Sequence, residues 1–523
     1  MILTKSDTWT RVTEFVSGEI NVLSECLDFR TEESPDTGFF LERDGDNYKF
    51  LTGLLPYVKE KLLSVVQFSI VDQTCQIEKE VPISDPLYLD GVELRDYQVR
   101  AAVKALYHGR GILDITTRGG KTEILAYIAK YYLALINPNG KVVVIVRTTS
   151  LMEQTYSRFL SRGLSSVGRL NGTFREFNKD IVVCVIDSLY NLVKNEDHPD
   201  GEFLERITAV LIDESHHLGA PSYAKSVLSI DNPDLLIGVS GTPFNCMESQ
   251  FHDHRDITIL GLLHRVLVKI PSDYLARQGH LALGHVFPLR YQARRSPYTL
   301  KNYNMVYSQF ISENKTRNLL VCQAAKEFDS VNFSCLILVI RIEHGKNLLR
   351  IISEFSPKSL FVSGKTGILR VYNEGVDFSS LPDGWEIYQD KEDRKLGREW
   401  IKYPADYPYK EELNSGSYNI LIGSTIFDEG EDIPNLDALI LAGGEGKSCV
   451  KAIQRSARVM TRKSGDNQVF IVDFLDNHHP YTKRHSELRL QTYRDRGYHV
   501  HPSDWGELQQ SISNSVYRRL GSE

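Results

Sequence analysis

A glycine-rich segment with a lysine follows a short apolar run and precedes a stretch of helical period; it contains Thr117, Gly119, Gly120, Lys121 and Thr122. Glycines let backbone N–H groups turn toward phosphate oxygens, and a helix N-terminus attracts anions. A lysine here places positive charge between the β and γ oxygens of a nucleoside triphosphate, and the threonine hydroxyl is a ligand for Mg²⁺. These five residues are therefore predicted to bind ATP.

The match to the phosphate-loop pattern is incomplete. The full pattern GxxxxGK[ST] requires glycine where this chain has Ile115. A glycine-rich surface turn before an ordinary helix is the alternative explanation of the segment, so the prediction depends on further motifs.

Two adjacent acids, Asp213 and Glu214, end the apolar run AVLID. Asp213 at the strand tip could hold Mg²⁺ through water, and Glu214 could polarise the water that attacks the γ-phosphate. His216 could form a hydrogen bond to the next motif. A helix N-terminus that carries acids is the structural alternative for this segment.

Small hydroxyl residues follow the next apolar run, which spans 235–239. Ser240 and Thr242 flank Gly241 on what is predicted to be a tight turn. Short hydroxyl side chains on such a turn are suited to respond when a phosphate is lost, so these two residues are predicted to couple hydrolysis to movement.

The elements that must position these residues are predicted from alternation of apolar runs with stretches of helical period, which indicates parallel sheets with crossover helices. The first series of runs comprises 112–116, 142–146, 181–186, 209–213 and 235–240. The second comprises 335–340, 359–362, 419–424, 437–442 and 469–474. Two series predict two α/β lobes.

The predicted domains follow from these series. Residues 1–90 form a small α+β N-terminal domain, in which Leu54, Leu55, Val58, Leu62 and Val65 recur at helical spacing. The first lobe covers 91–285, a polar linker with two prolines covers 286–316, and the second lobe covers 317–523. A mixed-charge insertion near 365–411 is predicted to be structured but outside the core, either a surface excursion or a substrate-contacting element.

The order of these motifs resembles superfamily-two helicases of the DEAD/DEAH-box type. The resemblance implies two tandem RecA-like parallel-sheet lobes and a nucleic-acid-stimulated ATPase. LRDYQ (94–98) is similar to the family's adenine-recognising segment, which implies that Gln98 contacts the adenine edge while Arg95 or Tyr97 flanks the ring. Two first-lobe runs resemble nucleic-acid motifs, with Thr148 and Ser188 as candidate phosphate contacts.

Two second-lobe segments, 423–441 and 454–462, resemble the family's fifth and sixth motifs. The resemblance implies that Thr425 contacts the nucleic-acid strand and that Gly430 and Asp432 approach the nucleotide. It also implies that Gln454 meets the γ-phosphate and that Arg458 and Arg462 supply arginine fingers. Such a finger stabilises charge on the transferring phosphoryl group and is worth roughly 10³ to 10⁵ in rate. The structural alternative is a solvated basic helix.

Four features depart from the family pattern. Arg118 replaces a glycine, Arg147 replaces a proline, and Ala457 replaces a glycine. The spacing between Arg458 and Arg462 is also one residue longer, which makes Arg458 the better candidate finger.

Within the superfamily, the chain most resembles phage UvsW-type helicases. The resemblance implies an ATP-dependent DNA helicase that unwinds or branch-migrates forked or branched DNA, with ATP and Mg²⁺ as cofactors. Single-stranded DNA and an RNA–DNA hybrid are further candidate partners. Two alternatives remain open: a duplex DNA translocase of a restriction or defence system, and a nucleic-acid-binding scaffold whose ATPase has decayed.

Composition bounds these hypotheses. The 523 residues are 41% hydrophobic with net charge -7, so any nucleic-acid track must come from local clusters of Lys and Arg. The seven cysteines form no CxxC pair and predict buried thiols rather than a metal site. No leader or membrane anchor is recognisable, which predicts a cytoplasmic protein, in the host cytoplasm if phage-encoded. Asp473 and Asp476 are predicted to be structural or capping acids, with a nuclease role as the alternative.

Overall fold

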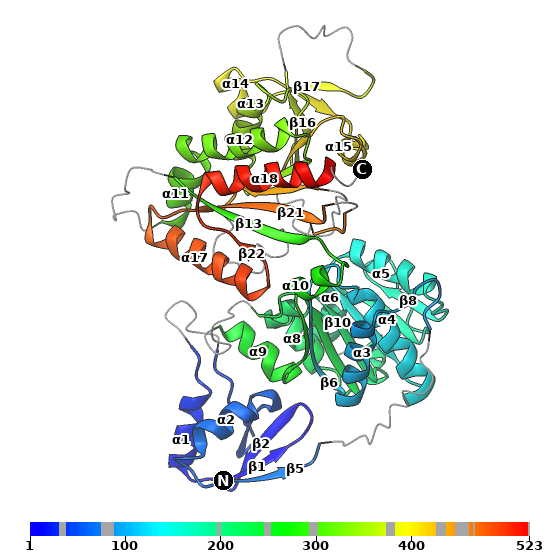
Figure 1. Cartoon of the computed structure of the whole chain (residues 1–523). Helices are drawn as coiled ribbons and strands as arrows, with labels where there is room; N and C mark the ends of the chain where they lie inside the picture. Colours follow the sequence, from blue (N-terminus) through cyan, green and yellow to red (C-terminus); the bar gives the residue numbers. More distant parts are fainter. Residues whose placement is uncertain are drawn as a thin grey trace. The chain divides into compact units, whose positions relative to one another are not determined.

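The computed structural model describes residues 1–30, 38–74, 88–195, 200–244, 253–291, 302–372, 382–424, 436–444, 460–463 and 466–520. The chain divides into two compact units, Met1–Ile270 and Pro271–Glu523. Figure 1 shows the elements of both units, coloured along the sequence. Among the described residues, no helix combines the length and apolar character that a membrane crossing requires.

The first unit begins with a five-stranded sheet in the order β3-β4-β2-β1-β5. Its strands are β1 (Ile2–Lys5), β2 (Trp9–Thr13), β3 (Glu42–Asp44), β4 (Asn47–Leu51) and β5 (Ser69–Asp72). Two helices accompany it, α1 (Ser17–Cys26) and α2 (Leu55–Leu62). In α2, Leu55, Val58 and Leu62 are buried at helical spacing, which confirms the predicted α+β composition.

This small sheet shares its core with the following lobe. A Cβ at Gly53 would lie 2.0 Å from the carbonyl oxygen of Leu260, so only glycine allows this approach. The buried guanidinium of Arg110 donates to the Leu262 carbonyl at 3.3 Å and to the Thr8 hydroxyl at 3.1 Å. The N-terminal segment is therefore docked on the first lobe rather than tethered to it.

The first lobe is built on a parallel seven-stranded sheet in the order β12-β6-β11-β10-β7-β9-β8. Its strands are β6 (Arg110–Ile115), β7 (Val142–Val146), β8 (Val167–Leu170), β9 (Ile181–Val185), β10 (Ala209–Asp213), β11 (Leu235–Ser240) and β12 (Val266–Ile270). All five predicted runs form strands, whereas β8 and β12 were not predicted. Parallel strands buried on both faces read as continuous apolar runs, which explains the agreement.

Helices connect these strands. They are α3 (Asp96–His108), α4 (Lys121–Tyr131), α5 (Thr149–Ser161), α6 (Ile186–Lys194), α7 (Glu202–Glu205), α8 (Pro221–Leu228) and α9 (His254–Leu263), with the short helical segments η2 (Tyr132–Ile136) and η3 (Ser215–Gly219); η1 (Thr52–Leu54) instead leads into α2 of the N-terminal domain. Because the strands are parallel, the loops that follow β6, β10 and β11 emerge at one edge of the sheet.

The second unit contains a ten-stranded sheet in the order β17-β18-β16-β15-β19-β14-β20-β21-β13-β22. The strands are β13 (Leu283–Arg290), β14 (Cys335–Leu338), β15 (Leu360–Ser363), β16 (Gly367–Val371), β17 (Glu386–Tyr388), β18 (Trp400–Tyr403), β19 (Ile420–Gly423), β20 (Ala438–Leu441), β21 (Gln468–Leu475) and β22 (His499–Val500). The seven strands from β15 to β22 in this order are parallel, and β16, β18 and β17 extend the edge antiparallel.

Helices of the second unit are α10 (Ser272–Arg277), α11 (Tyr303–Tyr307), α12 (Lys315–Ser330), α13 (Ile342–Ile352), α14 (Lys391–Leu396), α15 (Tyr409–Asn414), α17 (Pro480–Asp495) and α18 (Trp505–Leu520), with the turn η4 (Ser308–Ser312). All five runs of the second predicted series form strands. The two RecA-like parallel sheets and the N-terminal α+β sheet together confirm the predicted fold class.

The predicted boundary between the lobes differs from the structure. β13 pairs with β21 over its whole length, so 283–290 belong to the second lobe, and the units divide at Ile270 and Pro271. Residues 286–316 are therefore not simply a linker, since α11 and η4 bury Val306 and Phe310. Proline usually indicates a loop, but Pro288 lies beyond the two residues that β22 covers, where β13 needs no ladder donor on that side.

The insertion at 365–411 is more deeply embedded than predicted. Leu369 and Trp400, from β16 and β18, are buried in the lobe core. The ammonium of Lys346 on α13 is fully buried and contacts Asp390 and Asp393 at 2.6 Å each. The prediction of a segment outside the core is thus wrong for these residues. The many charged residues of the segment suggested a surface position, although its apolar side chains complete the sheet.

Candidate active site

The loop between β6 and α4 has the backbone shape of a phosphate cradle. Gly120 adopts φ 75° and Arg118 adopts φ 65°, both in the left-handed region. A Cβ at Gly120 would lie 2.1 Å from Gln98 Nε2, so any other residue would displace the Gln98 amide as well as strain the backbone. No side chain caps α4 at Gly120, and the first turn of a helix has unpaired N–H groups that can bind an anion. Arg118, by contrast, holds a conformation that costs an L-residue about 1 kcal/mol.

Lys121, the first residue of α4, forms an ion pair with Glu214. Burial disfavours the charged form of Lys121, but the carboxylates of Glu214 and Asp213 outweigh burial and raise the pKa of the ammonium. The lysine therefore stays charged, and Glu214 is a partner that an incoming phosphate could replace.

The two adjacent carboxylates at the end of β10 have different electrostatics. Burial raises the pKa of Asp213 although Lys121 opposes the shift. Burial also acts to raise the pKa of Glu214, but Lys121 and His216 hold it well below its usual range. Glu214 adopts φ 50°, and its N–H donates to Asp213 Oδ1 at 2.9 Å. Two carboxylates in different environments can perform different tasks.

A polar relay joins this pair to the end of β11. Ser240 Oγ lies 3.1 Å from His216 Nδ1 and donates to Glu214 Oε2 at 3.3 Å. The Thr242 N–H donates to Ser240 Oγ at 3.1 Å. Residues predicted separately as coupling elements are thus brought together in space by adjacent strands.

Thr242 offers a further polar group at this relay. Its Oγ1 is buried and has no hydrogen-bond partner among the described residues. A buried hydroxyl without a partner is costly, so this atom is suited to a ligand oxygen.

Sequence reasoning missed one acid at this edge. Asp114, near the end of β6, is buried and contributes to the raised pKa of Lys121. The available signal was an acid inside the otherwise apolar strand GILDI. Asp213 and the Thr122 hydroxyl remain the residues suited to a divalent cation by donor chemistry, since Mg²⁺ prefers oxygen ligands.

The predicted adenine segment contacts the phosphate loop directly. Tyr97 Oη donates to the Gly119 carbonyl at 2.9 Å, and Gln98 Nε2 donates to the same oxygen at 3.2 Å. Gln98 Oε1 accepts from the Arg95 N–H at 2.8 Å, and Arg95 also donates to Tyr97 Oη. The role of Tyr97 in holding the loop was not predicted. Binding of adenine by Gln98 stays a prediction.

The two candidate nucleic-acid contacts of the first lobe lie after neighbouring strands. Thr148 follows β7 and caps α5, where its hydroxyl accepts from the Leu151 N–H at 3.3 Å. Ser188 lies in the first turn of α6, after β9, and is half-buried. Capping gives Thr148 a structural task, so its contact with a strand remains a prediction.

Most predicted site residues of the second lobe lie outside the described residues. These are Thr425, Gly430, Asp432, Gln454 and Arg458. Arg462 is described and exposed.

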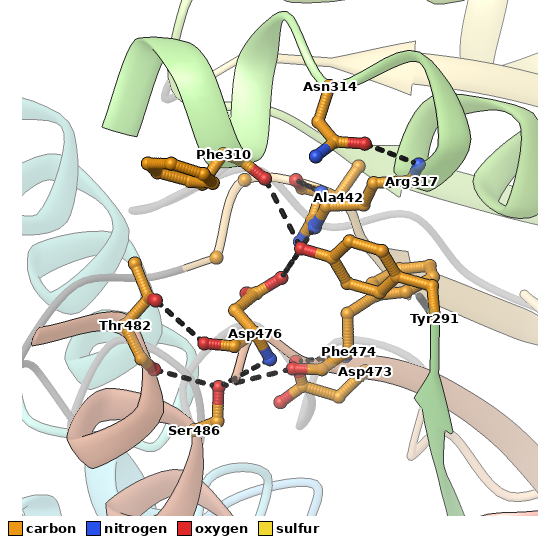
Figure 2. A network of polar contacts seen from close by, with 12 residues as sticks. Tyr291, Phe310, Asn314, Arg317, Ala442, Asp473, Phe474, Asp476, Thr482 and Ser486 are labelled. Atoms are coloured by element: carbon orange, nitrogen blue, oxygen red, sulfur yellow. Dashed lines mark hydrogen bonds and ion pairs between the residues drawn. The ribbon is translucent and has the colours of Figure 1, made fainter. Parts of the chain in front are cut away.

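The acids at the end of β21 are structural, as predicted (Figure 2). Asp476 Oδ1 accepts from Arg317 Nε and Tyr291 Oη, each at 2.8 Å. Asp473 accepts two hydrogen bonds from Arg489, at 2.8 and 2.9 Å. Acids held by buried arginines in this way are poor candidates for nuclease metal ligands.

Residues 91–245 match the family model described as "Type III restriction enzyme, res subunit". The chain is 25% identical over 421 residues to putative helicase 22 of Sulfolobus islandicus filamentous virus, covering 76% of this chain and 67% of that protein. It is 23% identical over 435 residues to the ATP-dependent DNA helicase uvsW of Enterobacteria phage T4, covering 77% of this chain and 76% of the relative.

A solved structure supports the same fold. The ATP-dependent Type ISP restriction-modification enzyme LlaBIII bound to DNA aligns with TM-score 0.53 and 14% identity, over 83% of this chain and 33% of that one. The motif order, the phosphate loop, the acidic strand end and these relatives agree. The chain is therefore similar to superfamily-two helicases, among them the phage UvsW group, and is an ATP-hydrolysing nucleic-acid helicase.

Proposed function

We propose that this helicase acts on forked or branched DNA, with Mg²⁺ accompanying ATP, in replication, recombination or repair. The observation that carries the proposal is the chain of contacts from Lys121 through Glu214 to Ser240, at the carboxyl ends of three neighbouring strands. Ligands of open α/β sheets bind at this edge. The phage T4 relative is named as a DNA helicase, which supports DNA as the substrate.

The proposed chemistry exchanges one ion pair for another. Lys121 leaves Glu214 and binds the β and γ oxygens, while the loop amides near Gly120 hold the remaining phosphate oxygens. Mg²⁺, held through Thr122 and Asp213, would neutralise phosphate charge when bound. Glu214, released from Lys121, orients the attacking water and accepts its proton. Ser240 loses one partner as Glu214 moves, which links the reaction to the end of β11.

Further roles are proposed for residues of the second lobe. Gln454 and Arg458 contact the γ-phosphate in this proposal, with Arg462 as the weaker candidate finger. Gly430 and Asp432 approach the nucleotide, and Thr425, Thr148 and Ser188 contact the nucleic-acid backbone. The family resemblance of their segments supports these roles.

ATP turnover at one stated salt concentration tests the motor chemistry. Lys121→Ala should lower kcat by about 10² or more, because a preorganised charge on the transferring phosphate is lost. Lys104→Ala, an exposed lysine on α3, is the matched control and should leave turnover unchanged. Equal turnover by wild type and Lys121→Ala would contradict the proposal and favour a decayed ATPase.

The DNA structure is tested separately. ATPase stimulation and strand displacement are measured with a fork, a four-way junction, single-stranded DNA, linear duplex and an RNA–DNA hybrid. We expect the greatest stimulation and displacement on forks and junctions. Equal stimulation by all five would leave the ATPase intact but contradict specificity for branched DNA.

A duplex translocase of a restriction or defence system is the second candidate. The matched family model and the LlaBIII structure favour it. ATPase activity on linear duplex with triplex displacement, but without strand separation on forks, would support this candidate over the first.

A further inference from the structure

Three histidines gather on one face of the second-lobe sheet, in a region that the ATP site does not use. His285 on β13 is paired in register with His499 on β22. His501 lies two residues further along, and its N–H continues the ladder to the Val286 carbonyl at 2.9 Å. Residues two apart on a strand share a face, and paired residues of parallel neighbours point the same way. Register therefore brings three imidazoles together.

The imidazole nitrogens are close enough to share one ion. One nitrogen from each ring lies within 4.8 Å of the other two. His285 Nδ1 is 2.8 Å from His501 Nε2. In a tetrahedral zinc site, Zn–N bonds of roughly 2.0–2.1 Å place ligand nitrogens about 3.3 Å apart. The 2.8 Å separation is shorter than that value and the other separations lie within 4.8 Å, so side-chain rotations can bring the three nitrogens to zinc spacing.

Two neighbours orient the rings for such a role. Glu507 Oε2 lies 3.8 Å from His501 Nδ1, behind the nitrogen that faces the cluster. Ligating histidines commonly present their second nitrogen to a carboxylate in this way. Phe287 stacks on His501 with ring centroids 4.2 Å apart. The remaining nitrogen of His285, Nε2, is buried without a hydrogen-bond partner in the described part of the chain.

We propose that His285, His499 and His501 bind a Zn²⁺ ion. Three imidazoles suit Zn²⁺ among biological metals, and a water molecule completes the tetrahedron. The exposed side of His499 provides the entry path that a metal site needs.

The ion acts as a clasp for the C-terminal segment. β22 has only two residues paired with β13, which is a weak attachment. The helix α18 begins four residues after His501 and buries Leu508 and Ile512 in the lobe core. Zn²⁺ bound across β13 and β22 holds α18 against the sheet (Figure 1 labels the three elements).

Metal content and thermal stability of the full chain test the clasp. After incubation with ZnCl₂ and desalting, we expect about one Zn²⁺ per chain. Zn²⁺ at about 100 times its Kd should raise the Tm of the second unit by about 5 to 10 °C. The Co²⁺-loaded protein should show tetrahedral absorption without thiolate charge-transfer bands, which separates this site from the seven cysteines.

Variants complete the test. His499→Gln, at an exposed position, and His285→Gln should each abolish stoichiometric uptake, and Glu507→Gln should weaken Zn²⁺ affinity about 10- to 100-fold. His254→Gln in the first unit is the control and should bind as the wild type does. Uptake that persists in both histidine variants, a thiolate spectrum, or no uptake by wild type would each overturn the proposal.

Discussion

Two parallel strands, one in each lobe, carry acids that pair with a basic side chain, and the two sites differ in the type of cation and in how deeply the pair is buried. At the end of β10, Glu214 has one lysine partner, and the side chains of Lys121 and Glu214 are 11% and 26% exposed. At the end of β21, Asp473 receives a two-pronged contact from Arg489, and these side chains are 3% and 1% exposed.

The difference indicates which acids can react. Arginine offers a planar fork that matches a carboxylate and is always charged, whereas lysine is a point charge on a flexible stem. The Arg489 and Arg317 guanidiniums also donate to the Gly444 and Ala442 carbonyls, which lie just before 445–459, the segment with the predicted finger. The ion pairs of the β21 acids are therefore expected to persist, whereas the ion pair between Lys121 and Glu214 can exchange for a phosphate contact.

Glu214→Gln should produce the largest change. The amide keeps the size of the side chain but cannot accept the proton of water, so kcat for ATP should fall by about 10³-fold, within the usual range for a general base. ATP affinity should be retained. Glu205→Gln, an exposed acid of the same lobe, should turn over ATP normally. A kcat within tenfold of wild type would remove Glu214 from the proposed role.

Arg489→Ala should remove the buried ion pair with Asp473. It leaves the buried carboxylate of Asp473 unpaired, so the free energy of unfolding of the second unit should fall by about 3 kcal/mol or more. Denaturant unfolding measures this change. Arg484→Ala, an exposed arginine on α17, should stay within about 0.5 kcal/mol of wild type. Similar losses in both variants would show that the two-pronged contact is not special.

Ser240→Ala should separate hydrolysis from coupling. The hydroxyl contacts His216, Glu214 and the Thr242 N–H, and a lost hydrogen bond of about 1.4 kcal/mol corresponds to about tenfold. We expect nucleic-acid stimulation of ATPase to fall about tenfold and basal turnover to change less. The exposed Ser161→Ala provides the control. An equal decrease in basal and stimulated rates would assign Ser240 to chemistry alone.

The smallest effect concerns pH. Burial lowers the pKa of His264 to about 3, so the folded chain leaves it neutral while the unfolded chain protonates it near pH 6.5. Unfolding therefore takes up a proton between pH 6.5 and 3, and stability falls as pH falls through that window. From pH 7.5 to 5.5 this histidine should contribute a loss of about 1 kcal/mol in the first unit.

His264→Asn isolates that contribution. Asparagine tolerates the φ of 68° at this position and has no group that titrates between pH 7.5 and 5.5. Its unfolding free energy should vary less with pH than that of wild type. Identical pH profiles would place the dependence on other groups, such as His217, whose pKa burial also lowers to about 3.

The sequence by itself determined the two lobes and the position of the phosphate loop. Strands buried on both faces must be continuously apolar, so runs such as 142–146 and 209–213 could be recognised as strands from the sequence. Lys121 and Glu214 were predicted from their separate motifs, and the order of the motifs along the chain indicated one ATP site. Gln454 and Arg458 remain predictions from resemblance.

The tertiary structure alone decided what depends on sheet order and register. Pro288 is compatible with β13 only because the strand beside it stops short. Asp473 and Asp213 have similar local sequences, and only the arginine that arrives from α17 makes the first of them structural. The histidine cluster joins residues more than 200 positions apart. Periodicity is a local property of a chain, whereas the residue that faces another on a neighbouring strand depends on the order and register of the whole sheet.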